Sequence, residues 1–244
     1  MARLKEYNGY YCESEYEYAF IGFLETEGWI YSSGNNISRV TKRDVLIADD
    51  FKKFIVDTNP DLTEDEVTQI FDNVRLVGSE SDFSTLHKVY GWMVNGIQFT
   101  PQDGIARMIP LIDFKKDSNK NIFRVVNQFT VEYTNNGQKE NRRPDVLLFV
   151  NGMPLCVIEL KNPADANATI YDAWEQINIR YWRDIPHLLH YCPLACISDG
   201  VKTRLGTVRT PYEHFYAWRR VNDGDAVSTL PLSLIHISEP TRRS

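Results

Sequence analysis

The stretch that decides the fold is residues 142–162, which read RRPDVLLFVNGMPLCVIELKN. The dipeptide Asn151-Gly152 is typical of a tight hairpin turn, and apolar residues flank it on both sides. The sequence therefore predicts two paired strands. Asp145 stands at the start of the first strand, and Glu159 and Lys161 stand at the end of the second. The hairpin brings all three to one end.

The charges on this second strand need an explanation, because the strand is otherwise apolar and burying a charge is costly. Side chains alternate across a strand, so Glu159 and Lys161 share one face and Leu160 points to the other. A strict two-residue turn would place Asp145 opposite Ile158, on the wrong face for Glu159. We therefore predict a β-bulge or an odd-length loop between Asp145 and Glu159.

Two carboxylates and a lysine at one place suit the hydrolysis of a phosphodiester. Mg2+ takes oxygen ligands and retains several waters, so one or two carboxylates suffice to hold it. We expect Asp145 and Glu159 to be those ligands, with the backbone carbonyl of Leu160 as a third. Lys161 is the candidate for orienting and deprotonating the attacking water. The spacing alone also fits surface ion pairs, but the apolar strand around Glu159 favours a site.

Composition sets wider limits. The chain has 244 residues, of which 43% are hydrophobic and 25% charged, as in globular proteins with one large domain or two small ones. A net charge of -6 argues against general affinity for nucleic acid but leaves room for a local basic groove. The four cysteines lack C-x-x-C spacing, which favours reduced thiols. We expect no signal peptide and no membrane span, since no apolar run approaches about 20 residues.

Hydrophobic periodicity predicts the remaining elements. Helices are expected over residues 13–26, 42–56, a segment capped by Thr63 and Glu66, 83–89 and 168–183. Strands are expected over 111–115, 122–133, 190–198 and 205–210, with an aromatic helix or turn over 212–221. This order predicts an α/β (α+β) fold, a mixed sheet with flanking helices and extra helices at the N-terminal end.

The motif Pro144-Asp145…Glu159-Leu160-Lys161 resembles the PD-(D/E)xK nuclease signature. The text around it resembles more narrowly the N-terminal domain of the restriction (R) subunit of type I restriction enzymes. The supporting segments span roughly residues 10 to 222. They are 111–114, 121–131, 143–155, 158–163, 197–200, 206–207 and 211–218.

This resemblance implies a PD-(D/E)xK core that cuts double-stranded DNA with Mg2+ in the prokaryotic cytoplasm. It also implies a larger subunit with an ATP-driven motor, assembled with modification and specificity subunits. No G-x-x-x-x-G-K-[ST] motif occurs here, so ATP would bind only to the absent motor. Residues 1–231 are then the nuclease domain, truncated before the motor. Residues 232–244 resemble the translation of a sequencing-library adapter and are expected to be non-native.

The resemblance also implies supporting residues. A glutamate on the first helix lies near the metal in the family, and Glu17 matches it best, with Glu13 second. The family has a Gln-x-x-x-Tyr element on the helix after the lysine. Here Gln176 has Arg180 at that spacing and Tyr181 one position later, which on an α-helix rotates the tyrosine by about 100°. Arg142 and Arg143 precede the motif and are candidates for phosphate contacts or for a solvated turn.

Two other functions stay open at this point. The chain could be a non-catalytic module that docks a partner through its acidic N-terminal third. It could also be a stand-alone nuclease of the same superfamily, acting in repair or transposition. The intact Asp145, Glu159 and Lys161 argue against the first, and the extent of the resemblance argues against the second.

Overall fold

A computed structural model describes residues 13–77, 81–115, 119–162, 169–199 and 202–217. Its centre is a seven-stranded sheet in the order β1-β4-β7-β8-β9-β10-β11. The pairs β1/β4 and β8/β9 are parallel, and the other neighbours are antiparallel. The bounds are β1 Ile30–Ser33, β4 Phe123–Asn127, β7 Val146–Val150, β8 Met153–Leu160, β9 Leu194–Ser198, β10 Thr203–Thr207 and β11 Tyr216–Ala217.

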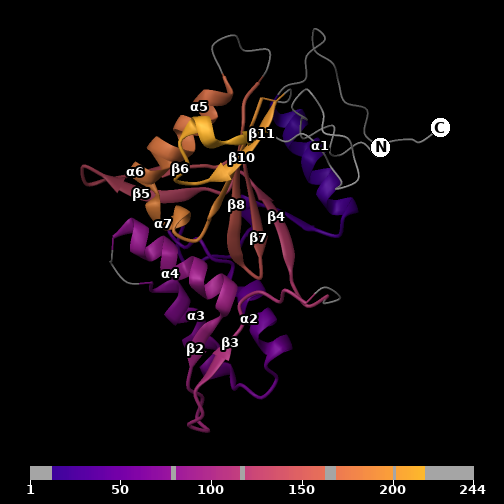
Figure 1. Cartoon of the computed structure of the whole chain (residues 1–244), viewed down its shortest axis with the longest axis vertical. Helices are drawn as coiled ribbons and strands as arrows, with labels where there is room; N and C mark the ends of the chain where they lie inside the picture. The colour runs from indigo at the N-terminus through magenta and orange to yellow at the C-terminus, as the bar shows by residue number, and fades with distance from the viewer. Residues whose placement is uncertain (1–12, 78–80, 116–118, 163–168, 200–201, 218–244) are drawn as a thin grey trace, which may run out of the picture.

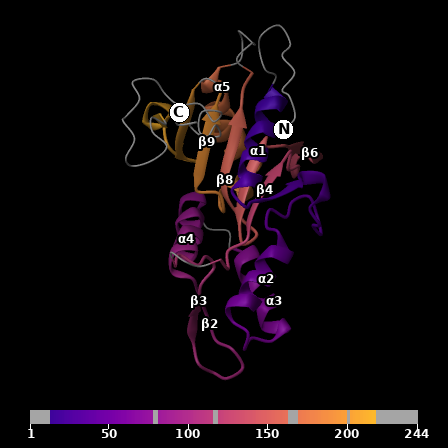
Figure 2. The ribbon, with the colours of Figure 1, turned by 90° about the vertical axis from the view of Figure 1, so that its right-hand side faces the viewer.

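Helices flank this sheet, as the sequence predicts. On one face lie α5 (Ile170–Glu175), the π-helical segment η2 (Gln176–Tyr181), α6 (Trp182–Asp184) and α7 (Pro186–Leu189). Helix α1 (Glu13–Thr26) packs on the other face, at the right of Figure 1 and in front of the strands in Figure 2. The mixed sheet with flanking helices confirms the predicted fold class and is consistent with a PD-(D/E)xK-like core.

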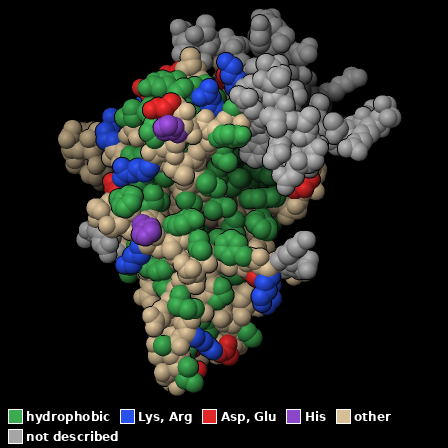
Figure 3. Space-filling model, viewed as in Figure 1, with side chains coloured by type: hydrophobic (Ala, Val, Ile, Leu, Met, Phe, Trp, Pro, Cys, Tyr) green, Lys and Arg blue, Asp and Glu red, His purple; other side chains and the backbone are tan. Residues whose placement is uncertain are grey.

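The alternation of side chains along the hairpin divides the core in two. Val146, Ile158 and Leu160 join the cluster under α1, whereas Leu147 and Val157 join the larger cluster on the other face. The core residues of the α1 cluster are all buried. Figure 3 shows hydrophobic side chains gathered over the middle of the sheet, where Figure 1 has β7 and β8.

A second lobe lies below the sheet in Figure 1. It contains α2 (Ala48–Thr58), α3 (Glu64–Arg75), α4 (Asp82–Asn95) and the hairpin of β2 (Ile97–Phe99) and β3 (Arg107–Ile109). A second small hairpin, of β5 (Val131–Asn135) and β6 (Gln138–Arg142), projects to the left of the sheet in Figure 1. Short 3-10 turns complete the described part at η1 (Gly34–Asn36) and η3 (Tyr212–His214).

Several predicted elements are right. Helix α1 has the predicted bounds, and α3 begins with the predicted capping box of Thr63 and Glu66. The turn at Asn151 and Gly152 has φ angles of 50° and 76°, positive at both positions as a type I′ turn requires. Cys156, Cys192 and Cys196 are free and buried, as expected of reduced thiols, and Cys12 lies outside the described residues.

Other boundaries are wrong. Helix α2 starts at Ala48 rather than at residue 42, because its N-cap Ile47 has extended backbone angles and residues 45–47 are buried ahead of the helix. Helix α4 is longer than the predicted 83–89, and residues 111–115 form no strand. The strand predicted over 122–133 is broken at Gln128, whose positive φ of 53° turns the chain out of the sheet. Its two halves, β4 and β5, belong to different sheets.

Candidate metal-dependent nuclease site

The register of the β7–β8 hairpin shifts by one residue, as predicted. Phe149 pairs with Pro154, but Leu148 pairs with Cys156. Leu155 is therefore the extra residue of a β-bulge. From this point to the open end of the hairpin, every residue of β7 is paired one position later on β8 than a plain two-residue turn would allow.

The bulge brings the two carboxylates to the same face. Val146 pairs with Ile158, so Asp145 lies level with Glu159. The contact affects the acidity of Glu159: burial, and then the charge and hydrogen bond of Asp145, raise the pKa of Glu159 well above its ordinary value. Glu159 is 0% exposed and Asp145 9%. The condition that the sequence set for a shared site is therefore met.

The peptide groups around Leu160 complete this edge. The Leu160 N–H donates to Asp145 Oδ2 at 2.8 Å, and the Lys161 N–H donates to the Ser198 carbonyl on β9 at 2.8 Å. In a trans peptide the C=O points opposite to the N–H. The Leu160 carbonyl therefore points away from β9 and toward the side of Asp145, where the sequence places a third ligand.

Two side chains of the following helix hold the Glu159 carboxylate. Gln176 Nε2 donates to Glu159 Oε2 and the Tyr181 hydroxyl donates to Oε1, both at 2.6 Å. Gln176 Nε2 also lies 2.8 Å from the Tyr181 hydroxyl, and Lys161 Nζ donates to Gln176 Oε1 at 3.0 Å. Burial and the adjacent Glu159 raise the pKa of the Tyr181 phenol well above its ordinary value, so this hydroxyl stays a donor.

The π-helical segment explains how Tyr181 reaches the carboxylate. Gln176 and Tyr181 are five residues apart, a spacing that an α-helix would place on different faces. Residues 176–181 instead form a π-helix, whose i→i+5 hydrogen bonding accommodates one extra residue in the turn. The expected rotation of Tyr181 away from Gln176 is therefore wrong. Arg180, at the four-residue spacing, is exposed.

Glu17 reaches the same end of the sheet from α1. It is buried, and its two oxygens accept hydrogen bonds from Asn127 Nδ2 at 2.6 Å and Gln128 Nε2 at 2.8 Å. Burial raises the pKa of Glu17, these two amides oppose the rise, and Asp145 adds to it. Asn127 and Gln128 were missed from the sequence. Their signal was a polar pair directly after the apolar Val125 and Val126 of β4. Nothing is described of the Glu13 side chain.

The two arginines before the motif, Arg142 and Arg143, differ in their surroundings. Arg142 binds Asp184 at 2.6 Å and is half-buried, whereas Arg143 is exposed. Arg143 opposes the rise in the pKa of Glu17, so its charge is felt by the carboxylate cluster.

The donor set fits a hard divalent cation. Two carboxyl groups in contact inside the protein need a proton or a cation between them, and the raised pKa of Glu159 expresses that need. Carboxylate and carbonyl oxygens are the ligands that Mg2+ prefers. Among the described residues, no group of three or more His, Cys, Asp and Glu is arranged as a complete ligand set. The fit therefore rests on Asp145, Glu159 and the Leu160 carbonyl, with the remaining positions left to water.

The sequence of the chain matches a known family over residues 10–214, described as the type I restriction enzyme R protein N terminus. The chain belongs to this family. A Methanocaldococcus jannaschii protein that carries the name of a type I restriction enzyme MjaIXP endonuclease subunit is 33% identical to this chain over 224 residues. The HindI endonuclease subunit of Haemophilus influenzae is 29% identical over 225 residues.

The R-subunit relatives are much longer than this chain. The matches cover 88% and 86% of the chain but only 21% and 20% of the two relatives. The chain thus spans about a fifth of their length. No helix in the described ranges is both long and apolar enough to cross a membrane.

Proposed function

We propose that this R-subunit domain is a Mg2+-dependent endonuclease that hydrolyses phosphodiester bonds of double-stranded DNA. The observation that carries the proposal is the convergence of Asp145 and Glu159 on one sheet face, beside Lys161. A bound Mg2+ would lower the pKa of a coordinated water and offset negative charge at the phosphorus. The whole subunit would act with an ATP-driven motor and with modification and specificity subunits in the prokaryotic cytoplasm.

Each side chain has a task in this reaction. Asp145, Glu159 and the Leu160 carbonyl would hold the cation. Lys161 would orient the attacking water and, as the amine, accept its proton while the water oxygen bonds to phosphorus and one phosphorus–oxygen ester bond breaks, the departing oxygen taking a proton from solvent. Gln176 and Tyr181 donate to the two oxygens of Glu159 and so would fix the orientation of this carboxylate toward the metal, as partners of metal ligands commonly do.

The test places Asp145→Asn, Glu159→Gln and Lys161→Ala in an R subunit that carries this domain, assembled with its partner subunits. We expect cleavage of duplex DNA in Mg2+ and ATP to fall by roughly 100-fold or more for each variant. Calorimetric titration of Mg2+ into the chain should lose its binding signal in the two carboxylate variants and keep it in Lys161→Ala.

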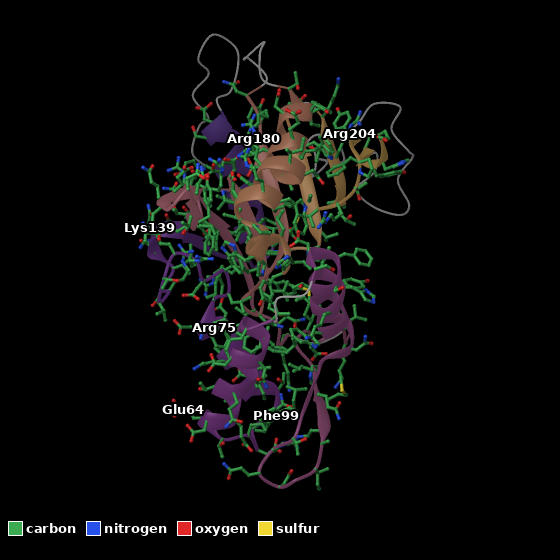
Figure 4. The ribbon with its side chains drawn as sticks, turned by 90° about the vertical axis from the view of Figure 1, so that its left-hand side faces the viewer. Glu64, Arg75, Phe99, Lys139, Arg180 and Arg204 are labelled. Atoms are coloured by element: carbon green, nitrogen blue, oxygen red, sulfur yellow. The ribbon has the colours of Figure 1, made fainter. Side chains whose placement is uncertain are left out.

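Glu64→Gln is the control, because Glu64 is an exposed carboxylate at the far end of the molecule in Figure 4. It should cut DNA at the normal rate. Undiminished cleavage by all three site variants would end the proposal. Normal Mg2+ binding by the two carboxylate variants would support instead a non-catalytic module that docks a partner.

A further inference from the structure

A hollow lined by arginines adjoins the carboxylate cluster. Its volume is about 650 Å3. Gln176 and Tyr181 form part of its lining and also bind Glu159, so the hollow shares two residues with the candidate metal site. Four arginines complete most of the lining, and we call it the arginine hollow. Its residues are Asn141, Arg142, Arg143, Gln176, Arg180, Tyr181 and Arg183.

Two of these arginines are already engaged. Arg142 and Arg183 both bind the Asp184 carboxylate, at 2.6 Å and 2.7 Å. The hydrogen bond from Arg183 lowers the pKa of Asp184, burial opposes this, and Arg142 lowers it further. The pKa of Asp184 is therefore below its ordinary value. The Asp184 side chain is only 6% exposed, and the Arg142 guanidinium also lies 5.3 Å from the centre of the Tyr133 ring. These contacts fix the rim where α6 meets the β5–β6 hairpin.

The other two arginines are uncommitted. Within the described ranges, neither Arg143 nor Arg180 forms an ion pair or a side-chain hydrogen bond, and both are exposed. Arg143 is two residues before Asp145 in the chain, and Arg180 lies on η2 next to Tyr181. Figure 4 shows Arg180 in the sheet lobe, far from Glu64 and Phe99 in the second lobe.

The chemistry of the hollow selects its occupant. A guanidinium group binds phosphate through two parallel hydrogen bonds, and two such groups beside a cleavage site suit a polyphosphodiester. The chain carries a net charge of -6, so this local concentration of positive charge is not a general property of its surface. A chain of phosphates can place one phosphate in the hollow and the next beside the cation that balances Asp145 and Glu159. An acidic ligand without repeated phosphates would occupy the hollow alone.

The geometry points to Arg143 and Arg180 as a phosphate clamp that holds a DNA backbone phosphate next to the phosphodiester bond that is cut. Arg142 and Arg183 position the rim through Asp184 and do not bind the phosphate. This assignment rests on the proposed nuclease function and adds to it a second point of contact with the same strand. The clamp would fix which phosphate enters the metal site.

The test is the binding of a fluorescent DNA duplex to the chain without Mg2+, measured by anisotropy over a range of salt concentrations. We expect Arg143→Ala and Arg180→Ala each to weaken binding by about 3- to 10-fold and to lower the salt slope by about one. Lysine at either position should keep the salt slope but restore only part of the affinity, because it cannot form the paired hydrogen bonds.

Two arginines serve as matched controls. Arg183→Ala removes the same charge from the same hollow but should weaken binding less than twofold, because Arg183 is paired with Asp184. Arg204→Ala, outside the hollow, should leave binding unchanged. Equal effects of Arg180→Ala and Arg183→Ala would overturn the clamp in favour of a diffuse field. Wild-type binding by the Arg143 and Arg180 variants, or no duplex binding by the chain at any salt, would also overturn it.

Failure of the clamp is distinguishable from failure of the nuclease function. If Asp145→Asn abolishes cleavage but Arg143→Ala and Arg180→Ala bind duplex normally, only the clamp is wrong. If Asp145→Asn, Glu159→Gln and Lys161→Ala all cleave normally, the nuclease proposal fails whatever the arginine variants do. Thermal melting by circular dichroism checks that each variant is folded. Arg143 and Arg180 are exposed, so their removal should not change the melting temperature appreciably.

Discussion

At the scale of single residues, Gln128 shows how the site constrains its surroundings. Its φ of 53° lies in the left-handed region, which costs a non-glycine residue about 1 kcal/mol or more. The conformation is held by its side chain on Glu17 and by its N–H on the Asp145 carbonyl at 2.9 Å. Gly34 makes room for it, since a Cβ there would lie 2.6 Å from the Gln128 carbonyl oxygen.

His187 allows a prediction about acid stability. Burial, then the nearby Arg43 and His190, lower its pKa to about 4 from an ordinary 6.5, and its Nε2 has no hydrogen-bond partner among the described residues. Below pH 6.5 His187 is therefore protonated in the unfolded chain, whereas in the folded chain it stays neutral until about pH 4. This histidine should cost the fold about 2.5 kcal/mol between pH 7 and pH 4.5.

Urea unfolding at these two pH values measures the effect. His187→Gln should lose less stability on acidification than the wild type, by about that 2.5 kcal/mol. The control is His87→Gln, at an exposed histidine on α4, which should follow the wild type. Parallel losses in all three proteins would show that His187 is not the source.

At the scale of elements, the sequence predicted the hairpin well because its constraints are local. Asn151-Gly152 demands a tight turn, and the parity of side chains then required a bulge before Asp145 and Glu159 could meet. The break in the strand at Gln128 was not predictable in this way, because it depends on Glu17 and Gly34, distant in sequence. The position of Tyr181 was missed for another reason: residue counting assumes α-helical geometry throughout.

The π-helical segment predicts an unusual tolerance to deletion. Removing Ile179, which is 49% exposed, should let residues 176–180 close as an ordinary α-helix with glutamine and tyrosine four residues apart. Both would still face Glu159, so cleavage by the assembled enzyme should stay within about threefold of normal. Inserting one alanine after Ile179 should move Tyr181 away and lower cleavage by roughly 10- to 100-fold, the usual effect of losing a partner of a metal ligand.

Tyr181→Phe is the reference variant, since it removes the same hydrogen bond without changing the length of the helix. It should match the insertion in cleavage and in Mg2+ affinity. The interpretation would be wrong if the deletion were as damaging as the insertion, because the contact would then require the π-helical turn itself.

At the scale of the whole molecule, the hairpin connects two lobes. Its open end carries the carboxylates, and its turn packs against α2, where the Ile47 N–H donates to the Gly152 carbonyl at 2.8 Å. A Cβ on Gly152 would lie 2.2 Å from the Ile47 carbonyl oxygen and 2.8 Å from the Phe51 nitrogen. The side chain of Asn151 adds hydrogen bonds to the Ile122 N–H and the Leu111 carbonyl.

Gly152→Ala should therefore loosen the junction between the lobes. We expect it to lower the free energy of unfolding by at least about 2 kcal/mol, and the melting temperature by several degrees, without changing DNA binding at low temperature. Gly137→Ala is the matched control, because Gly137 has a similar φ of 78° but nothing within 4 Å of a Cβ. Calorimetry should find the two variants well separated; equal melting temperatures would mean that the backbone angle alone, and not the packing, matters.

The β5–β6 hairpin has a mechanical consequence. The chain leaves the sheet at Gln128 and returns at Asp145, and the hydrogen bond between these two residues closes the base of the hairpin. The base of the hairpin thus includes a candidate metal ligand, Asp145. A force on the tip of the hairpin, near Lys139, would act on Asp145 through Gln128 and through the strand β6. A displacement of the hairpin would therefore move Asp145 relative to Glu159, which would link the position of this projection to the geometry of the two carboxylates.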